Sequence, residues 1–479
     1  MKNTQLLRCA AIMALAAGIT AACSSSGSPG SSNSSASSTS TPASATGSAA
    51  SVVATPSLDF GSTGSDLTKL FGSFPMVKGD TTRGVTATSV NFGAVVDETV
   101  DNVPEFPGMC AGIQARIELA NKLHQTKHHI NFTGCQDSGG DPNRMASLLE
   151  QAVDVNHDFA MDWTPEVETT TDLLTQDHVP YFGYGTTADF CGSQYPFAFS
   201  DTGAGICGAV EVQSGGKTNV ISDTVIVPTA QALGLSPKQV RLALVTDDYA
   251  KGVLLNEAEA NAAKAEGIDP VYAEASIPLA TSGATINYTP YVSKILAAKP
   301  NLIVALIPGP NLVGFVSGLR QAGYNGAVLQ ALYSDPSIFQ NPAVADALND
   351  TYAVNGLGSP SFPSAAWNTI KSAAAAVGAS SEVSSLGFDH GYASADMFVD
   401  ALKAFEATGK ALTTENFTNF INAGWTYPGY SNAFAPVEWP ASHFVGNGCS
   451  SIVQVDNSTK QIKGIYTLRC YPVSLKTAP

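Results

Sequence analysis

Charged residues are scarce in this chain of 479 residues, and cationic ones are scarcer than anionic ones. Only 13% of the residues are charged, and 24 Lys and Arg stand against 40 Asp and Glu, which gives a formal net charge of −16. This balance argues against binding to nucleic acid and against electrostatic attachment to anionic lipid. The body of the chain also lacks an apolar run of about 18 residues, so we predict no membrane-spanning helix there.

The N-terminus has the pattern of an export signal. Lys2 and Arg8 precede a short apolar segment, 10–19, and Thr20-Ala21-Ala22-Cys23 follows. A small-residue sequence ending in Cys resembles a bacterial lipobox, although Thr20 stands where Leu is usual. We therefore predict a lipoprotein signal peptide at 1–22 and lipidation of Cys23. An ordinary signal peptide cleaved nearby is the alternative.

A low-complexity segment follows the signal. Residues 24–57 are almost all Ser, Ala, Thr, Gly and Pro, a composition that cannot bury a core. A coil of this kind reaches roughly 30 Å. We predict that residues 23–84 are a lipidated tether that holds the folded body just outside a membrane.

Cysteine is scarce as well, and no C-x-x-C spacing occurs, which argues against a metal site. Besides Cys9 and Cys23, six cysteines remain, an even number that favours disulfides in an exported chain. They fall into sequential pairs, and among the possible connectivities we favour Cys110–Cys135, Cys191–Cys207 and Cys449–Cys470. Neither a metal nor another cofactor is expected.

Strand and helix patterns alternate from about residue 89 onwards. Predicted strands at 89–96, 129–135, 158–161, 179–182 and 195–200 are separated by helices at 111–123, 143–155 and 166–176. This order predicts parallel βαβ units with helices on both faces.

The second half repeats the pattern. We expect a segment at 203–233 that is helical at least in part, strands at 240–246, 271–275, 302–306, 327–331 and 351–357, and helices at 252–266, 288–298, 311–322, 365–377, 391–408 and 417–423. A hairpin of 451–455 and 462–468 ends the chain.

The stretch Asp137-Ser138-Gly139-Gly140 has two interpretations. It is similar to the loop around the nucleophile of trypsin-like serine proteases, but Gln136 and Asp141 differ from that motif, and no Ala-Ala-His-Cys sequence occurs upstream. As a turn, it joins a strand to a helix, with Asp141 as the N-cap and Pro142 at the first helical position. We favour the turn and do not expect an enzyme.

Two other pairs suggest chemistry at first sight. His128 and His129 are adjacent on a predicted strand and point to opposite faces, so we expect the start of a strand rather than a metal site. Asp247 and Asp248 end another strand, but no nucleophile or histidine accompanies them, which argues against a catalytic pair.

Several motifs together resemble those of type I extracytoplasmic solute-binding proteins, the branched-chain amino acid and amide receptors of ABC importers. They include Cys135-Gln136-Asp137…Asp141-Pro142-Asn143, the strand and turn 242–252, and the segments 287–292 and 296–301. The resemblance runs from about residue 85 to 475. It implies two doubly wound parallel-sheet α/β lobes that are joined by a three-segment hinge and hold the ligand in the cleft between them.

Carried onto this chain, the resemblance places lobe 1 at 85–200 and 335–435 and lobe 2 at 201–334 and 436–479, with crossings near Asp201, Ser334 and Pro436. It also implies a set of ligand-binding residues on the rim of the cleft: Asp97, Glu98, Asp162, Trp163, Thr164, Tyr184, Gly185, Thr186, Tyr249, Thr285 and Asp335. Trp163 has core packing as an equal alternative.

One departure bears on the ligand. Amino-acid receptors of this family carry an acid just before a lobe 2 helix, to hold the ligand's ammonium, whereas the matching stretch 282–287 has none. A buried ammonium without a carboxylate is costly, so an amide, a polyol or another neutral polar molecule is as well supported as an amino acid, unless Asp162, Asp247 or Asp335 supplies the charge.

The function expected from these observations is a monomeric, lipid-anchored solute receptor that delivers a small molecule to an ABC permease. A ligand sensor with the same fold and no transport role is the main alternative. A secreted hydrolase that uses Ser138 is the third.

Overall fold

The computed structural model describes residues 74–100, 103–165, 171–204, 209–212, 216–221, 226–248, 250–265, 267–278, 286–307, 309–331, 333–334, 336–470 and 474–477. The chain divides into two units, Met1–Val53 and Ala54–Pro479, and every described residue belongs to the second. The predicted signal peptide, Cys23 and most of the predicted tether lie outside the described residues. Within the described part of the chain, no helix is long and apolar enough to span a membrane.

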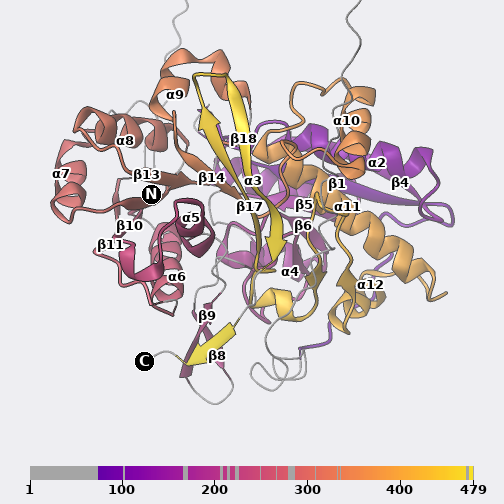
Figure 1. Ribbon diagram of the computed structural model, residues 1–479. Helices are drawn as coiled ribbons and strands as arrows, with labels where there is room; N and C mark the ends of the chain where they lie inside the picture. Colours follow the sequence, from indigo (N-terminus) through magenta and orange to yellow (C-terminus); the bar gives the residue numbers. More distant parts are fainter. Residues whose placement is uncertain are drawn as a thin grey trace, which may run out of the picture. The chain divides into compact units, whose positions relative to one another are not determined.

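Five parallel strands form the first sheet, in the order β4-β1-β5-β6-β7 (Figure 1). Their bounds are β1 Ser89–Val96, β4 His129–Asp137, β5 Ala160–Thr164, β6 Tyr181–Gly183 and β7 Ala198–Ser200. Along β1, Phe92 and Ala94 face one core and Val95 faces another, as the two-residue period of a strand requires. All five strands overlap predicted ones, and the predicted α/β class is confirmed.

Helices cover both faces of this sheet. On one face, α2 (Met109–Lys122) packs against the long α11 (Leu386–Glu406), which comes from much later in the chain. Phe398 of α11 stacks on Phe92 of β1, with ring centroids 4.4 Å apart. On the other face, α3 (Pro142–Glu150) buries Met145 and Leu149. The remaining elements near this sheet are β2 Thr99–Val100, β3 Val103–Pro104, η1 Gln151–Val155, α4 Thr171–Gln176, η2 Ala188–Phe190, α10 Ala365–Ala376, α12 Thr414–Asn422, β15 Thr426–Tyr427, β16 Val437–Glu438 and η5 Ala441–His443.

A second sheet has seven strands, in the order β11-β10-β12-β13-β14-β17-β18. The first five are parallel, and β17 and β18 join them antiparallel as the predicted hairpin. The strands are β10 Leu242–Asp247, β11 Tyr272–Ile277, β12 Leu302–Leu306, β13 Ala327–Gln330, β14 Tyr352–Asn355, β17 Cys449–Asp456 and β18 Gln461–Cys470. The helical elements that precede these strands or lie between them in sequence are α5 Ile226–Ala232, η3 Pro237–Gln239, α6 Ala250–Ala265, α7 Thr289–Ala297, α8 Gly309–Gln321, η4 Pro336–Gln340 and α9 Pro342–Ala347.

The segment 203–233, predicted to be helical at least in part, contains the helix α5 and also two strands that were not predicted. The strands β8 Ala209–Val212 and β9 Gly216–Ile221 form an antiparallel hairpin, and among the described residues of this segment only those of α5 are helical. The last strand, β19 Ser474–Thr477, pairs with the other edge of β9. Val and Ile in this stretch suit a strand, and the pairing partner lies some 250 residues away in sequence, which no local pattern reveals.

The membership of β14 in the second sheet bears on the proposed lobe boundaries. The expectation assigned 335–435 to lobe 1, yet β14 pairs with β13 and β17. We therefore propose that the second crossing follows Asn355 rather than Ser334. Near the other two proposed crossings, the chain segments lie side by side, because Gly203 pairs with Gly446 and the Asn447 amide donates to the Thr202 carbonyl at 2.8 Å.

Two of the three predicted disulfides are present. Cys110 and Cys135 are bonded with Cα atoms 5.5 Å apart, and Cys449 is bonded to Cys470, its register partner on β18. Cys191 is also disulfide-bonded. Because Cys207 lies outside the described residues, the pair Cys191–Cys207 stays a prediction.

Candidate functional site

Polar side chains gather at one edge of the five-stranded sheet, where its parallel strands end. In α/β proteins ligands bind outside the carboxyl ends of the strands. Here Asp97, Ser138 and Tyr184 directly follow β1, β4 and β6, and Thr164 is the last residue of β5. This edge is therefore the candidate site.

The Asp137-Ser138-Gly139-Gly140 stretch is a turn, as predicted. The Ser138 hydroxyl is buried and donates to the carboxylate of Asp97, which also accepts from the Gly140 amide at 3.1 Å. Gly140 has a φ of +71°, a conformation that glycine adopts without steric cost. Asp141 then caps α3 by accepting from the Asn143 and Arg144 amides.

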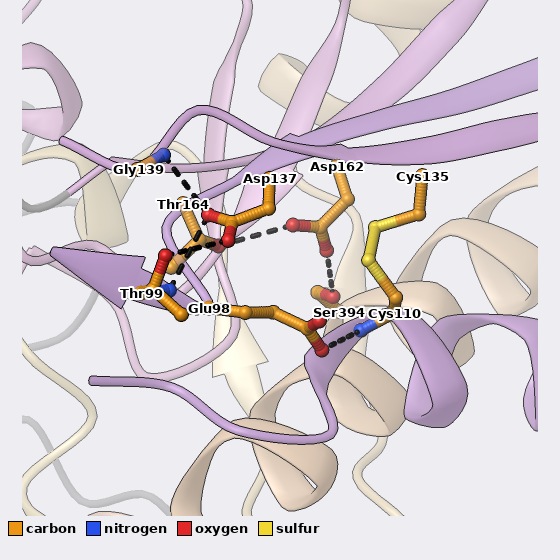
Figure 2. Close-up of a disulfide and its surroundings, with 9 residues drawn as sticks. All are labelled: Glu98, Thr99, Cys110, Cys135, Asp137, Gly139, Asp162, Thr164 and Ser394. Carbon is orange, nitrogen blue, oxygen red and sulfur yellow. Dashed lines mark hydrogen bonds between the residues drawn. A yellow bond between two sulfur atoms is a disulfide. The ribbon is translucent and has the colours of Figure 1, made fainter. Parts of the chain in front are cut away.

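Asp137 and Glu98 hold the neighbouring loop in place (Figure 2). The Asp137 carboxylate accepts from the Thr99 hydroxyl at 2.7 Å and from the Gly139 amide at 3.0 Å. The Glu98 carboxylate accepts from the Cys110 amide at 3.0 Å, in the first turn of α2, where a negative charge is favourable. Burial raises the pKa of Glu98. The disulfide Cys110–Cys135 ties this helix start to the end of β4.

The predicted residues on β5 point to opposite faces. Asp162 and Thr164 face α11. The Asp162 carboxyl group accepts from the Thr164 hydroxyl at 3.0 Å and lies in hydrogen-bond contact with the Ser394 hydroxyl of α11 (Figure 2). Burial raises the pKa of Asp162 to about 8. Trp163 is fully buried in the core beneath α3, as the core-packing alternative expects, and its role toward a ligand stays a prediction.

The loop after β6 is held by its own hydrogen bonds. The Tyr184 amide donates to the Thr164 hydroxyl at 3.2 Å, and the Gly185 amide donates to the Ser200 hydroxyl at 3.2 Å. The Thr186 hydroxyl donates to the Pro165 carbonyl at 2.9 Å. A hydroxyl has only one proton, so neither Thr164 nor Thr186 has a proton left to donate to a ligand in this arrangement.

Three residues that the sequence analysis did not select complete the cluster. His390 and Ser394 lie one helical turn apart on α11, and Asp201 follows β7. The His390 Nδ1 atom is 2.8 Å from the Asp201 carboxylate, and both side chains are fully buried. Burial raises the pKa of Asp201, against the opposite effect of His390. The signal in the sequence is the spacing of His390 and Ser394 at i and i+4, which places both on the same face of a helix.

Three further predicted ligand-binding residues, Tyr249, Thr285 and Asp335, lie outside the described residues. Among their described neighbours, the Thr246 hydroxyl donates to the Gly252 carbonyl at 2.7 Å. Their roles stay predictions, as do those of Asp97, Glu98, Asp162, Thr164, Tyr184, Gly185 and Thr186 toward a ligand.

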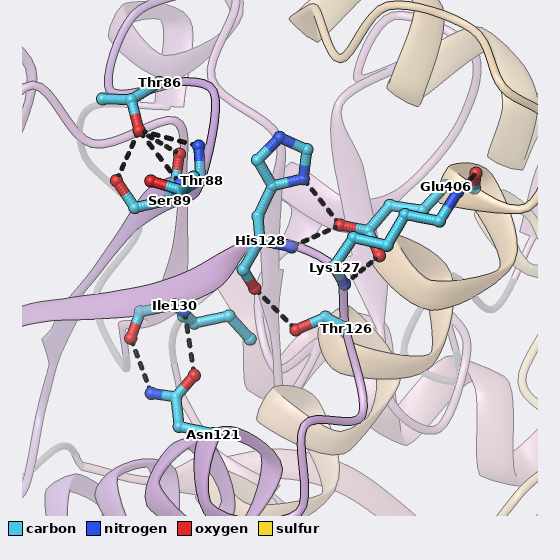
Figure 3. A network of polar contacts seen from close by, with 9 residues as sticks. All are labelled: Thr86, Thr88, Ser89, Asn121, Thr126, Lys127, His128, Ile130 and Glu406. Atoms are coloured by element: carbon cyan, nitrogen blue, oxygen red, sulfur yellow. Dashed lines mark hydrogen bonds and ion pairs between the residues drawn. The ribbon is translucent and has the colours of Figure 1, made fainter.

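The histidine pair lies at the start of β4, away from its carboxyl end, and Figure 3 shows His128 with its hydrogen-bond partners. The His128 Nδ1 atom is 2.7 Å from the Glu406 carboxylate at the end of α11, and the Lys127 ammonium donates to the Glu406 carbonyl. This supports the start of a strand rather than a metal site. In the described part of the chain, no three His, Cys, Asp or Glu side chains are grouped as metal ligands.

A hollow of about 640 Å³ also lies away from the candidate site. It is bordered by α2, the first half of β4 and α10, with Ile117, Ile130 and Ala373 among its lining residues. Since these residues flank the beginning of β4 and not its carboxyl end, the hollow is separate from the candidate site.

Residues 89–461 match the family model described as periplasmic binding protein. The chain belongs to this family. The match confirms the resemblance to type I, leucine-binding-like receptors and identifies the chain, at the coarse level, as a solute-binding protein. No curated protein matches the chain in sequence.

Solved structures of periplasmic binding proteins share the fold. A Rhodopseudomonas palustris solute-binding protein in complex with 4-hydroxybenzoate has a TM-score of 0.60 at 18% identity over 80% of this chain and 98% of its own. A fatty acid ABC transporter substrate-binding protein from Thermomonospora curvata has a TM-score of 0.61 at 17% identity, over 82% and 94%. A branched-chain amino acid ABC transporter protein from Thermus thermophilus with bound valine has a TM-score of 0.61 at 13% identity, over 81% and 98%. Their ligands differ widely, so the fold alone does not select one.

Proposed function

We propose that this protein is an extracytoplasmic lipoprotein that captures a small polar solute, such as an amino acid or an amide, in the cleft between two lobes and delivers it to an ABC importer. Lipidation of Cys23 and the tether at 23–84 would keep the protein at the membrane surface, as a monomer. The observation that carries the proposal is the convergence of the β1, β5 and β6 loops at one sheet edge, in a chain of the periplasmic binding protein family.

The hydrogen bonds of these loops support a ligand other than a simple amino acid. The hydroxyl protons of Thr164 and Thr186 are used within the protein, which leaves fewer donors for a ligand carboxylate. The stretch 282–287 contains no acid for an ammonium group. An amide or another neutral polar molecule fits both observations better.

A thermal-shift screen tests the proposal. The panel contains amino acids, amides, sugars, polyols, hydroxybenzoates and fatty acids. A ligand at a hundred times its Kd stabilises the folded state by about 2.7 kcal/mol, so a true ligand raises the Tm. Tyr184→Ala should abolish the shift, and Tyr466→Ala, on β18, should keep it. A shift that Tyr184→Ala leaves unchanged would place the ligand elsewhere.

Calorimetry with leucine tests the ligand class. Tight leucine binding that persists in Asp162→Asn, Asp247→Asn and Asp335→Asn would contradict the preference for a ligand without an ammonium group.

The sensor alternative predicts the same ligand binding but no effect on transport, so stimulation of a reconstituted importer by the loaded protein separates the two. Ser138 is buried and bonded to Asp97, which argues against the hydrolase. Labelling by a fluorophosphonate probe that disappears in Ser138→Ala would revive it.

A further inference from the structure

Asp162 has an unusual set of neighbours for a carboxylate. It lies in the interior of the five-stranded sheet, where its register partners on the adjacent strands are Ala94 and Phe182, both buried. Its own exposed fraction is 0%. A charged carboxylate in such surroundings requires several donors or a cation close by.

The protons around Asp162 can be counted. The Thr164 hydroxyl accepts from the Tyr184 amide and donates its one proton to Asp162 Oδ1. The Ser394 hydroxyl lies within hydrogen-bond distance of both Asp162 Oδ2 and the Gly391 carbonyl, at 3.1 Å for the carbonyl. A carbonyl oxygen only accepts, so when Ser394 donates to Gly391 the contact with Oδ2 needs a proton that Asp162 itself supplies. A protonated Asp162 satisfies all four groups at once.

The charges that face Asp162 also favour its protonated, neutral state. Asp201, after β7, repels a second negative charge, and its partner His390 on α11 is already engaged with it. Asp97, after β1, is another acid at this edge, and Asp396, further along α11, is paired with Arg116. No Lys or Arg among the described residues forms an ion pair with Asp162. Burial is the main cause of its raised pKa.

We propose that Asp162 is held as a neutral carboxylic acid in the folded protein and that this acid is a positioning residue for the two loops after β5 and β6. Its hydroxyl bonds to Ser394 of α11, and its carbonyl oxygen fixes Thr164, which in turn holds the Tyr184 amide. Ionisation would force Ser394 to leave Gly391 and would place two negative charges, Asp162 and Asp201, beside one histidine. The loops therefore loosen in alkaline solution. The inference rests on the proposed function only in treating these loops as ligand-binding.

The first test is the pH dependence of stability in the wild type and in Asp162→Asn, measured by urea unfolding between pH 5 and 9. The amide of Asn reproduces the neutral acid, since its N–H₂ donates to Ser394 and its oxygen accepts from Thr164. The unfolded chain releases the Asp162 proton near the ordinary aspartate pKa of 3.8, and the folded protein releases it near 8. Between these values the folded state binds one more proton, so stability falls as the pH rises. Relative to Asp162→Asn, the unfolding constant of the wild type should rise about tenfold per pH unit and level off above about pH 8.

Asp158→Asn is the matched control. Asp158 is also buried, and its carboxylate accepts from the Thr133 hydroxyl, but its pKa is raised only to about 6. The free energy of unfolding of Asp158→Asn should diverge from that of the wild type below about pH 6. Above that pH the two curves should run parallel. Wild-type and Asp162→Asn curves that stay parallel from pH 5 to 9 would overturn the proposal.

A second readout follows the loops themselves. Amide hydrogen exchange in residues 181–187, corrected for the intrinsic effect of pH, should accelerate above about pH 8 in the wild type and stay constant in Asp162→Asn. If Asp162→Asn does not fold, an infrared carboxylic-acid band of the wild type that titrates near pH 8 supports the proposal, and the absence of such a band contradicts it. A solute screen without a hit would contradict the proposed function and leave these curves unchanged.

Discussion

Tyr184 lies face to face with His390, with ring centroids 3.7 Å apart. His390 is buried and paired with Asp201, so the ring of a proposed ligand-binding residue rests on a buried polar pair. Phe106 meets Tyr184 edge-on at 5.9 Å. The position of Tyr184 therefore depends on α11, which lies more than 200 residues further along the chain.

Loss of His390 should destabilise the protein strongly. In His390→Ala the Asp201 carboxylate stays buried without its partner, and breaking a buried pair from one side costs about 3–5 kcal/mol. Urea unfolding measures the loss. The double variant Asp201→Asn/His390→Ala should recover part of it, because no charge is then left unpaired. A double variant that is as unstable as the two single losses added together would show that the residues do not act as a pair.

The buried ion pair between α2 and α11 should behave in the same way. Arg116 contacts Asp396 with both side chains almost fully buried, and Arg116→Met should cost about 3–5 kcal/mol. The exposed pair Lys294–Glu274 provides the comparison. Lys294→Met should leave the urea midpoint unchanged, because water screens an exposed pair. Equal effects of the two substitutions would contradict the importance of burial.

The disulfide Cys110–Cys135 should contribute both to stability and to the site. In the chain-entropy model, Cys110→Ser/Cys135→Ser costs about 3 kcal/mol. The pair Cys449–Cys470 closes a loop of similar length, with a sequence separation of 21 against 25, so its removal should lower the Tm by a similar amount. Only the first double variant should also weaken solute binding, since Glu98 accepts from the Cys110 amide. Equal loss of binding in both would argue for a general loss of folding.

His443 should limit stability in acid. It is fully buried, with Nε2 2.8 Å from the Asn422 side-chain oxygen, and burial lowers its pKa to about 3. The unfolded chain takes up a proton near the ordinary histidine pKa of 6.5 and the folded chain only near 3, so the stability present above pH 6.5 is lost as the pH falls between these values.

His443→Gln should lack this pH dependence. Between pH 6.5 and 4, the unfolding constant of the wild type should therefore rise about tenfold more per pH unit than that of His443→Gln. Urea unfolding from pH 4 to 7 measures it. An unchanged slope in His443→Gln would show that this histidine is not kept neutral by burial.

The sequence alone predicted much of the fold and only part of the candidate site. The features predicted correctly depend on residues close in sequence. Periodicity predicted the strand 89–96, helix capping predicted the cap at Asp141, and turn chemistry predicted the hairpin joined by Cys449 and Cys470. The pairing of Cys110 with Cys135 was also accessible, because both lie at the same edge of a parallel sheet.

Only the tertiary structure decided the rest. The sequence analysis missed the hairpin β8–β9. The strand β19, which pairs with the free edge of β9, comes from the end of the chain, and no local pattern reveals that pairing. For Trp163 the sequence left core packing and ligand binding as equal alternatives, and the fold places its side chain in the core beneath α3. Asp162, selected as a rim residue, acquired its raised pKa from burial under α11 and from Asp201, which is distant in sequence. Local patterns fix which elements form, whereas the protonation and hydrogen bonding of a buried acid depend on the side chains that packing brings against it.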